Sequence, residues 1–153
     1  MQKTNEDIWK KVLAKDEVLE KEFTISDRYI KISLITGIII WGLLSLAGGI
    51  GIPFLLIHLF YFLFYIKKAN AYAFTNKRVL IHKGWLSTNL VSVDYHKITD
   101  IFVEEPFLGR AIFNTGALAI DTAGTSSKEI ILKNISEPYE LKKILDELKD
   151  KAN

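Results

Sequence analysis

Residues 32–66, ISLITGIIIWGLLSLAGGIGIPFLLIHLFYFLFYI, decide the fold of this 153-residue chain. No residue of this run is charged at neutral pH, and glycines and Pro53 interrupt it near its middle. One continuous helix over the run would be roughly 50 Å long, against a hydrocarbon core of about 30 Å. We therefore predict a transmembrane hairpin, with helices over residues 32–47 and 53–66 and a tight turn over residues 48–52.

The alternative is a pair of helices buried in the core of a soluble protein. A helix that faces such a core normally keeps one polar stripe, and neither half of this run has one. On membrane-insertion scales Leu, Ile, Phe and Val each favour the bilayer by about 0.3–0.6 kcal/mol, and these residues dominate both halves. The composition therefore favours two membrane spans.

Charge is distributed unevenly around the hairpin, although the formal net charge is only +2. Residues 32–93 contain no acidic residue, and the turn carries no charge at all. Basic residues flank the end of each predicted span that lies away from the turn: Arg28, Lys31, Lys67 and Lys68. By the positive-inside rule we expect a multi-pass protein of the cytoplasmic membrane with both termini in the cytoplasm. Three tyrosines suit the cytoplasmic headgroup zone: Tyr29, Tyr61 and Tyr65.

After residue 68 the pattern becomes strand-like. Two β-rich runs, 71–75 and 78–83, are joined by Asn76 and Lys77, a turn signal. Apolar and polar residues alternate over 91–95 and 101–104, and runs over 116–122 and 127–133 complete the set. Six or seven short strands predict an antiparallel sandwich or barrel, with a loop or single helical turn over 106–114.

Two amphipathic helices are expected outside the strands. The N-terminal one has a short apolar stripe and either lies at the membrane or docks on the soluble domain: Ile8, Trp9, Val12 and Leu13. Residues 17–25 are interpreted as an extended or loosely ordered lead into the first span. The C-terminal helix should be capped by Ser136, carry Pro138 in its first turn, and close the open end of the sheet with one stripe: Leu141, Ile144, Leu145 and Leu148.

Several blocks of sequence resemble the bacterial pleckstrin-homology-like (PH-like) domains, which often follow a two-helix membrane anchor. The blocks are YAFTNKRVL at 72–80 followed by Gly84, KITDI at 97–101, LGR at 108–110, TGALAI at 115–120 and TAG at 122–124. The similarity covers roughly residues 72–148. It implies a seven-stranded, strongly bent sheet closed by a C-terminal helix, and it brings no established catalytic residues with it.

Together these features predict an α+β membrane protein. The expected organisation is a cytoplasmic N-terminal segment with a short amphipathic helix over 1–31, a transmembrane hairpin over 32–66, and a cytoplasmic domain over 67–153. That domain should be a PH-like bent antiparallel sandwich or barrel of six or seven strands, capped by an α-helix.

Eukaryotic relatives of the fold often bind phosphoinositides through basic clusters. Five basic residues are our candidates for contact with anionic lipid at the membrane surface: Lys67, Lys68, Lys77, Arg78 and Lys83. Each would contribute about 1 kcal/mol if it lay near the surface. The plainer interpretation is that these residues only fix the topology, because a tethered domain needs no lipid affinity to reach the bilayer.

His58 is an ionisable residue near the middle of the second span, and such residues are candidates for function. Folding the run at its glycines would bring His58 opposite Trp41 and Gly42, with Ser45 nearby. A haem or metal site would need ligands that the rest of the hairpin lacks, although a homodimer would supply a second histidine. Structural packing is the favoured interpretation.

The sequence offers no enzyme constellation. It has no cysteine, which excludes thiolate chemistry and disulfides. His82 and His96 lie on or beside predicted strands without paired carboxylates and are expected at the surface, and Glu104 and Glu105 should point to opposite faces of a strand. We expect no enzyme, no cofactor or metal, no nucleic acid and no small-molecule substrate.

The predicted function is that of a non-enzymatic, membrane-anchored interaction or scaffold module. The bilayer is one expected partner, and a protein or a second copy of the chain is the other. Phe107, Leu108 and Ile112 are the preferred contact patch for a protein, although packing of the same residues in the core is equally compatible with the pattern. The alternatives are an accessory subunit of a membrane transporter or secretion complex that binds through its hairpin, and a sensor of anionic lipid.

Overall fold

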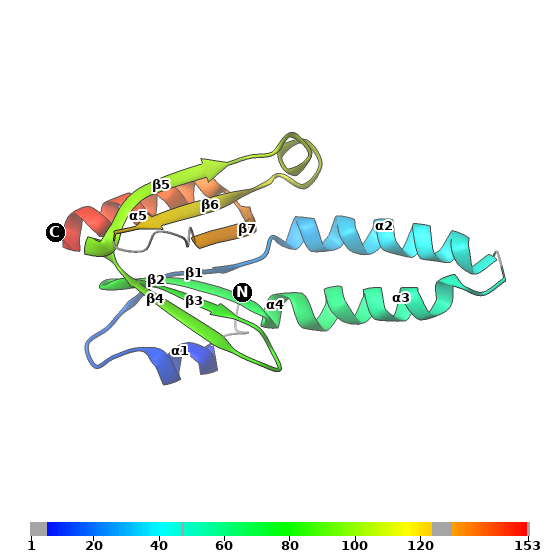
Figure 1. Cartoon of the computed structure of the whole chain (residues 1–153), viewed down its shortest axis with the longest axis horizontal. Coiled ribbons are helices and arrows are strands. Elements are labelled where there is room, and N and C mark those ends of the chain that lie inside the picture. Colours follow the sequence, from blue (N-terminus) through cyan, green and yellow to red (C-terminus); the bar gives the residue numbers. More distant parts are fainter. Residues whose placement is uncertain (1–5, 47, 124–129, 153) are drawn as a thin grey trace.

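A computed structural model of the chain describes residues 6–46, 48–123 and 130–152. Two antiparallel sheets pack face to face, a C-terminal helix lies against them, and a helical hairpin projects from one end (Figure 1). The four-stranded sheet has the order β1 (Leu19–Thr24), β2 (Asn70–Thr75), β3 (Arg78–Lys83) and β4 (Asn89–Asp94). The three-stranded sheet has the order β5 (Ile98–Glu104), β6 (Thr115–Thr122) and β7 (Ile130–Ser136). The seven strands and the C-terminal helix confirm the predicted fold.

Strand β1 precedes the hairpin, whereas its partner β2 follows it. The two strands pair in antiparallel register, with Phe23 opposite Tyr72 and Thr24 opposite Ala71. The segment interpreted as a lead into the first span is therefore an edge strand of the four-stranded sheet. The hairpin is a long insertion between the first two strands.

The main core lies between the two sheets. Successive side chains of a strand point to opposite faces, and β2 sends Tyr72 and Phe74 inward. Phe23 meets Phe74 edge-to-face with ring centroids 4.9 Å apart. Leu118 and Leu132 close this core from the three-stranded sheet, and both are fully buried.

The N-terminal helix α1 (Glu6–Val12) packs on the outer face of the four-stranded sheet. Its Trp9 is buried against Ala71, Ala73 and Leu80, and the two alanines leave room for the indole ring. Of the two positions expected for this helix, docking on the strand domain is the one found. Strand β2 is consequently buried on both faces.

Helix α5 (Pro138–Ala152) packs against the three-stranded sheet through the predicted stripe, in which Leu141, Leu145 and Leu148 are buried. The expected cap is wrong, because Ser136 is the last residue of β7. Its hydroxyl donates to Ser26 Oγ at 2.9 Å instead of capping the helix. Glu137, with φ +52°, makes the bend into α5, and its carbonyl accepts the Leu141 N–H.

The hairpin consists of α2 (Asp27–Leu46) and a second helix over residues 51–68, formed by α3 (Gly51–Phe60), a π-helical turn (Tyr61–Tyr65) and α4 (Ile66–Lys68). Both helices extend further toward the strands than residues 32 and 66, where we placed their ends. By length and composition both could cross a membrane. Gly48 (φ +88°) and Gly49 (φ +79°) turn the chain with left-handed backbone that glycine adopts without strain.

Candidate functional site

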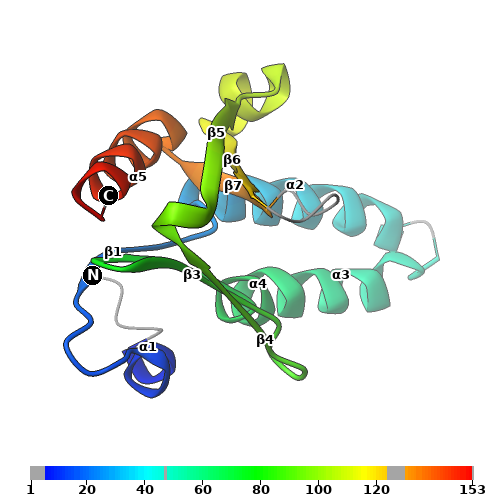
Figure 2. The same cartoon turned by 60° about the vertical axis from the view of Figure 1, so that its left-hand side comes forward.

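One end of the sandwich gathers most of the residues that the sequence marks for function. The hairpin leaves this end, and three further connections reach it (Figures 1 and 2). These are the turn between β3 and β4, residues 84–88, the loop between β5 and β6, residues 105–114, and the bend from β7 into α5 at Glu137. We call it the hairpin end. The turn between β2 and β3 lies at the opposite end, one strand length away.

The β3–β4 turn leans on the second helix of the hairpin. Gly84 adopts φ +97° there, and the Trp85 ring that follows lies 6.1 Å from the ring of Phe60 and 6.3 Å from that of Tyr65. Lys68 Nζ stands 5.6 Å from the centre of the same indole, within cation–π range. Leu86, the next residue, is almost fully exposed.

The β5–β6 loop leans on the first helix of the hairpin. It is helical, with a π-helical stretch over Gly109–Phe113 that ends at Asn114, where φ is +52°. Phe113 contacts Tyr29 in the first turn of α2, with ring centroids 5.1 Å apart. The proposed contact residues Phe107, Leu108 and Ile112 all lie on this loop and are exposed.

The five candidate basic residues do not form one patch. Lys67, which forms an ion pair with Asp27, lies at the hairpin end with Lys68 and Lys83. Lys77 lies in the β2–β3 turn at the opposite end. Arg78 begins β3 beside it and is occupied by an ion pair. The six residues of β3 place roughly 17 Å or more between the two groups.

The opposite end is closed by a buried ion pair. The Arg78 guanidinium donates from Nε and Nη2 to the two carboxylate oxygens of Glu17, each at 2.8 Å. The Ala14 N–H and the Thr75 hydroxyl donate to the same carboxylate at 2.9 and 2.8 Å. The hydrogen bond from Arg78 outweighs burial and lowers the pKa of Glu17 to about 2. The Arg78 guanidinium is therefore used in an ion pair that stabilises the fold.

A cleft of about 490 Å³ opens between the two sheets near the base of the hairpin. Among the residues that the structure describes, its lining includes two cations, Lys83 and Lys133, and no carboxylate. The other described lining residues are Ile25, Tyr29, Tyr61, Ile66, Asn70, Tyr72, Ile131 and Asn134. Burial raises the pKa of Tyr72 to about 12, so its hydroxyl is neutral at pH 7. Such a lining suits an anionic group that also offers apolar surface.

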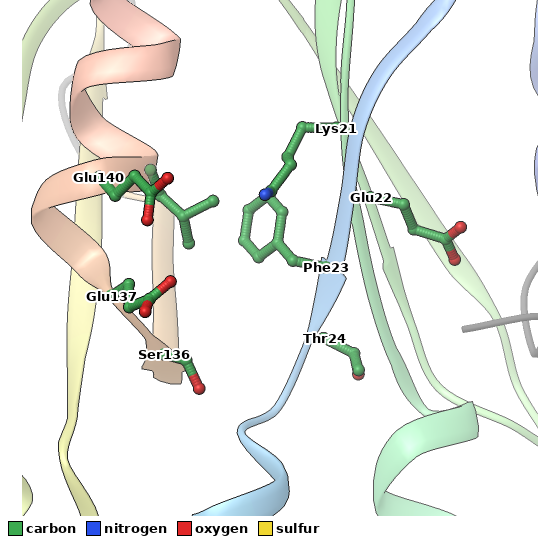
Figure 3. A pocket seen from close by; sticks show the side chains of 8 residues that line it. Lys21, Glu22, Phe23, Thr24, Ser136, Glu137 and Glu140 are labelled. Atoms are coloured by element: carbon green, nitrogen blue, oxygen red, sulfur yellow. The ribbon is translucent and has the colours of Figure 1, made fainter. Parts of the chain in front are cut away.

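A smaller cavity, of about 190 Å³, separates β1 from the start of α5. Figure 3 shows Lys21 and Phe23 pointing across it toward the helix, while Glu22 and Thr24 point away. Glu137 and Glu140 face it from the other wall. The charges are mixed, and the lining holds no histidine that would serve as a base for a nucleophile.

His58 occupies a different position in the hairpin from the one expected. Its Nε2 donates to the carbonyl oxygen of Ser33 at 3.0 Å, and its ring lies on Gly37, where a Cβ would come within 2.0 Å of Nε2. Trp41 stacks instead on Phe54, with centroids 5.1 Å apart. The expected pairing was wrong by about one helical turn, because α2 ends before the glycines and the second helix already begins at Gly51.

The remaining histidines split between core and surface. His96 is exposed as expected, but His82 is buried, which corrects the expectation for that residue. His82 shares the face of β3 that carries Leu80, the face on which α1 packs. Burial lowers the pKa of its imidazole. Within the described ranges, no group of three or more His, Asp or Glu residues is placed to hold a metal ion.

The family model of the bacterial PH domain matches residues 19–149. The chain belongs to the bacterial PH domain family. The match begins at β1, so it includes the strand that precedes the hairpin as well as the blocks recognised in the sequence. It thereby confirms the resemblance stated above and extends it toward the N-terminus.

Solved structures agree on the fold. A DUF1696 family protein with a pleckstrin-homology domain from Shewanella loihica PV-4 superposes with a TM-score of 0.51 at 13% identity, over 94% of this chain and 91% of that chain. A pleckstrin homology domain from Shewanella amazonensis SB2B superposes with a TM-score of 0.52 at 13% identity, over 94% of this chain and 83% of that chain. At this identity the likeness concerns fold alone. No curated protein matches the chain.

Sequence reasoning missed one part of the hairpin end, the pair Trp85–Leu86. The signal was present, because residues 84–93 carry no charge and a tryptophan followed by a leucine in a short turn after glycine is unusual for a solvated loop. The cleft could not be foreseen, since its lining comes from segments on both sides of the hairpin and from β7.

Proposed function

We propose that this bacterial PH domain protein is a membrane-anchored, non-enzymatic binding module. PH domains of this family are generally non-catalytic binding or scaffold modules. The hairpin would hold the strand domain against the cytoplasmic leaflet, where tethering raises its effective concentration toward other membrane components. The bilayer is then the first partner, and a membrane protein or a second copy of the chain is the next.

One observation carries the membrane assignment: only 11% of the apolar window of either hairpin helix is buried within the molecule. A core helix of a soluble protein would be mostly covered by its own chain. Here Ile39, Leu43 and Leu56, for example, point outward and are exposed. A soluble protein rarely exposes continuous apolar surface on this scale, because water disfavours it.

The orientation follows from charge. Arg28, Lys31, Lys67 and Lys68 lie where the hairpin joins the strands, and the turn at its tip carries none. Because β1 and β2 pair across the base of the hairpin, the chain would leave and re-enter the membrane on the same side. The positive-inside rule then assigns that side, and both termini, to the cytoplasm.

Fractionation and tag accessibility test this proposal. The full chain should sediment with membranes after alkaline extraction and be released by detergent, and tags at Met1 and Asn153 should both be cut by protease only from the cytoplasmic side. Recovery in the supernatant without detergent, or tags on opposite sides, would refute it.

The accessory-subunit alternative differs in which part binds the partner. In-membrane crosslinking with mass spectrometry would identify neighbours, and exchanging the hairpin for an unrelated one would separate the two ideas. A module that binds through its strand domain keeps its crosslinks after the exchange. On that domain β4 offers the free edge of the four-stranded sheet, and its first four residues are exposed.

A sensor of anionic lipid is the second candidate, and the cleft favours it. Within the described parts of the chain, Lys83 and Lys133 are the charged residues of its lining. Native mass spectrometry of the full chain from nanodiscs should show retained anionic lipid, and the double variant Lys83→Ala and Lys133→Ala should lose it. Lys77→Ala, at the opposite end, is the matched control. Equal retention by all three proteins would dismiss the cleft as the site.

A further inference from the structure

Two loops at the hairpin end expose large apolar side chains. In the β5–β6 loop Phe107 is 74% exposed, Leu108 61% and Ile112 45%. In the β3–β4 turn Leu86 is 90% exposed and Trp85 39%. Leu86, Phe107 and Leu108 are the most exposed of these side chains, whereas Trp85 is partly covered by the hairpin.

Contacts with the hairpin fix the position of both loops along the length of its helices. The β3–β4 turn touches Phe60 and Tyr65 through Trp85, and the β5–β6 loop touches Tyr29 through Phe113. Tyr29 lies in the first turn of α2, and Tyr65 lies just before the lysines that end the second helix. Both loops therefore stand beside the helical turns at which the hairpin passes from charged to apolar sequence.

The chemistry of the loops matches the boundary between lipid headgroups and acyl chains. Tryptophan, phenylalanine and leucine favour this zone, and nearby cations favour anionic headgroups. Residues 84–90 carry no charge, and residues 106–114 carry only Arg110. Lys68 stands over the Trp85 ring. Each loop thus places exposed apolar groups beside a cation, which is Arg110 of the β5–β6 loop itself and Lys68 of the hairpin next to the β3–β4 turn.

The arrangement of the loops favours lipid over a protein as their partner. The β5–β6 loop lies beside α2 and the β3–β4 turn beside the second helix, on opposite sides of the hairpin (Figures 1 and 2). A protein would have to straddle the hairpin to cover both loops. A bilayer that surrounds the hairpin meets both at once.

We propose that the Trp85–Leu86 turn and the loop carrying Phe107, Leu108 and Ile112 insert into the interfacial zone of the cytoplasmic leaflet. With the hairpin between them they make a three-point contact that fixes the tilt of the strand domain on the membrane. This contact points the inter-sheet cleft at the headgroups. The inference rests on the proposed membrane anchoring and deepens it.

Site-directed spin labelling of the full chain in vesicles of pure phosphatidylcholine and phosphatidylglycerol tests the proposal. Because the chain has no cysteine, single variants Leu86→Cys and Leu108→Cys can each be labelled alone. Val18→Cys is the matched control, since Val18 is also an exposed apolar residue but bonds Asn76 at the opposite end. Leu44→Cys reports on the hairpin itself.

The readout is the ratio of collisions with oxygen, which concentrates in lipid, to collisions with a water-soluble nickel chelate. We expect this ratio to be several-fold higher at Leu86 and Leu108 than at Val18, and highest at Leu44. Loop ratios equal to that of Val18, with a high ratio at Leu44, would overturn the inference and leave the anchor standing. A low ratio at Leu44 would overturn the anchor and the inference together. Protection of the loops only in native membranes, and not in pure lipid, would point to a protein instead.

Discussion

The two ends of the β-sandwich are built on opposite principles. At the end far from the hairpin a carboxylate and a guanidinium are enclosed, and each is satisfied by several hydrogen bonds. At the hairpin end large apolar side chains such as Leu86, Phe107 and Leu108 are mostly exposed. The polar groups at the first end are satisfied by hydrogen bonds within the protein. The apolar side chains at the second end are exposed, and only an apolar environment outside the described chain would bury them. The same fold therefore separates the residues that hold it together from the exposed apolar residues for which we propose a membrane contact.

Removing Arg78 should have the largest effect on stability. Arg78→Ala leaves the fully buried Glu17 carboxylate without its counter-charge, and breaking such a pair costs about 3–5 kcal/mol in the free energy of unfolding. Denaturant unfolding of the detergent-solubilised chain measures it. Lys77→Ala, at the adjacent exposed position, should change stability by less than about 0.5 kcal/mol. Equal effects of the two variants would contradict the role assigned to the pair.

Acid should reduce the stability that the ion pair between Glu17 and Arg78 contributes. The pKa of Glu17 falls from 4.5 to about 2 on folding, so the pair stabilises the fold fully above pH 4.5 and loses this contribution as the pH drops toward 2. The loss is on the order of 3 kcal/mol. Thermal unfolding between pH 6 and pH 2 would reveal it. The slope should flatten in Arg78→Ala, and an unchanged slope there would assign the acid sensitivity to other carboxylates.

Within the hairpin, Gly37→Ala should cost about 1–3 kcal/mol, the range for overpacking a tight contact. A Cβ at Gly37 meets the His58 ring, whereas a Cβ at Gly42 meets nothing within 4 Å. Gly42→Ala is therefore the matched control. Thermal unfolding in detergent, read by helical circular dichroism, should separate the two variants. Identical midpoints would show that the helices do not pack through His58.

The smallest effect is expected at the exposed loops. Leu86→Ser and Leu108→Ser should each change the free energy of unfolding by less than about 0.5 kcal/mol, because neither side chain packs in the core. Leu118→Ala, at a fully buried position, should cost about 2–5 kcal/mol. Denaturant unfolding in detergent compares the three variants. A loss above about 2 kcal/mol at either loop would place that residue among those that hold the fold together.

Local patterns were enough to predict much of this molecule. The hairpin, the strands joined at Asn76 and Lys77, and the apolar stripe of α5 all follow from period and composition over a few residues. Strand β1 was harder to predict from its sequence, because it is a charged edge strand, LEKEFT, with one buried side chain, Phe23. Its partner lies beyond the hairpin, and no local signal reveals a pairing at that distance.

The candidate site was harder to foresee because it depends on which strand ends meet. Lys77 and Lys83 are close in sequence, yet β3 separates them by its whole length. Arg78 has the pattern of a surface cation, and only its ion pair with the distant, buried Glu17 ties it to the fold. Phe107 and Leu108 were chosen as a contact patch with core packing left equally open, and their place beside the hairpin follows from the course of β5 and β6.

The position of the hairpin between β1 and β2 also orders events during synthesis. The ribosome releases β1 long before β2 exists, so the early strand has no partner in its sheet while both hairpin helices are made. Bringing β1 and β2 together across so long a connection has an entropic cost, and the pairing of the two strands offsets this cost only after β2 has been made. The four-stranded sheet therefore cannot be completed until the hairpin has brought β2 back beside β1.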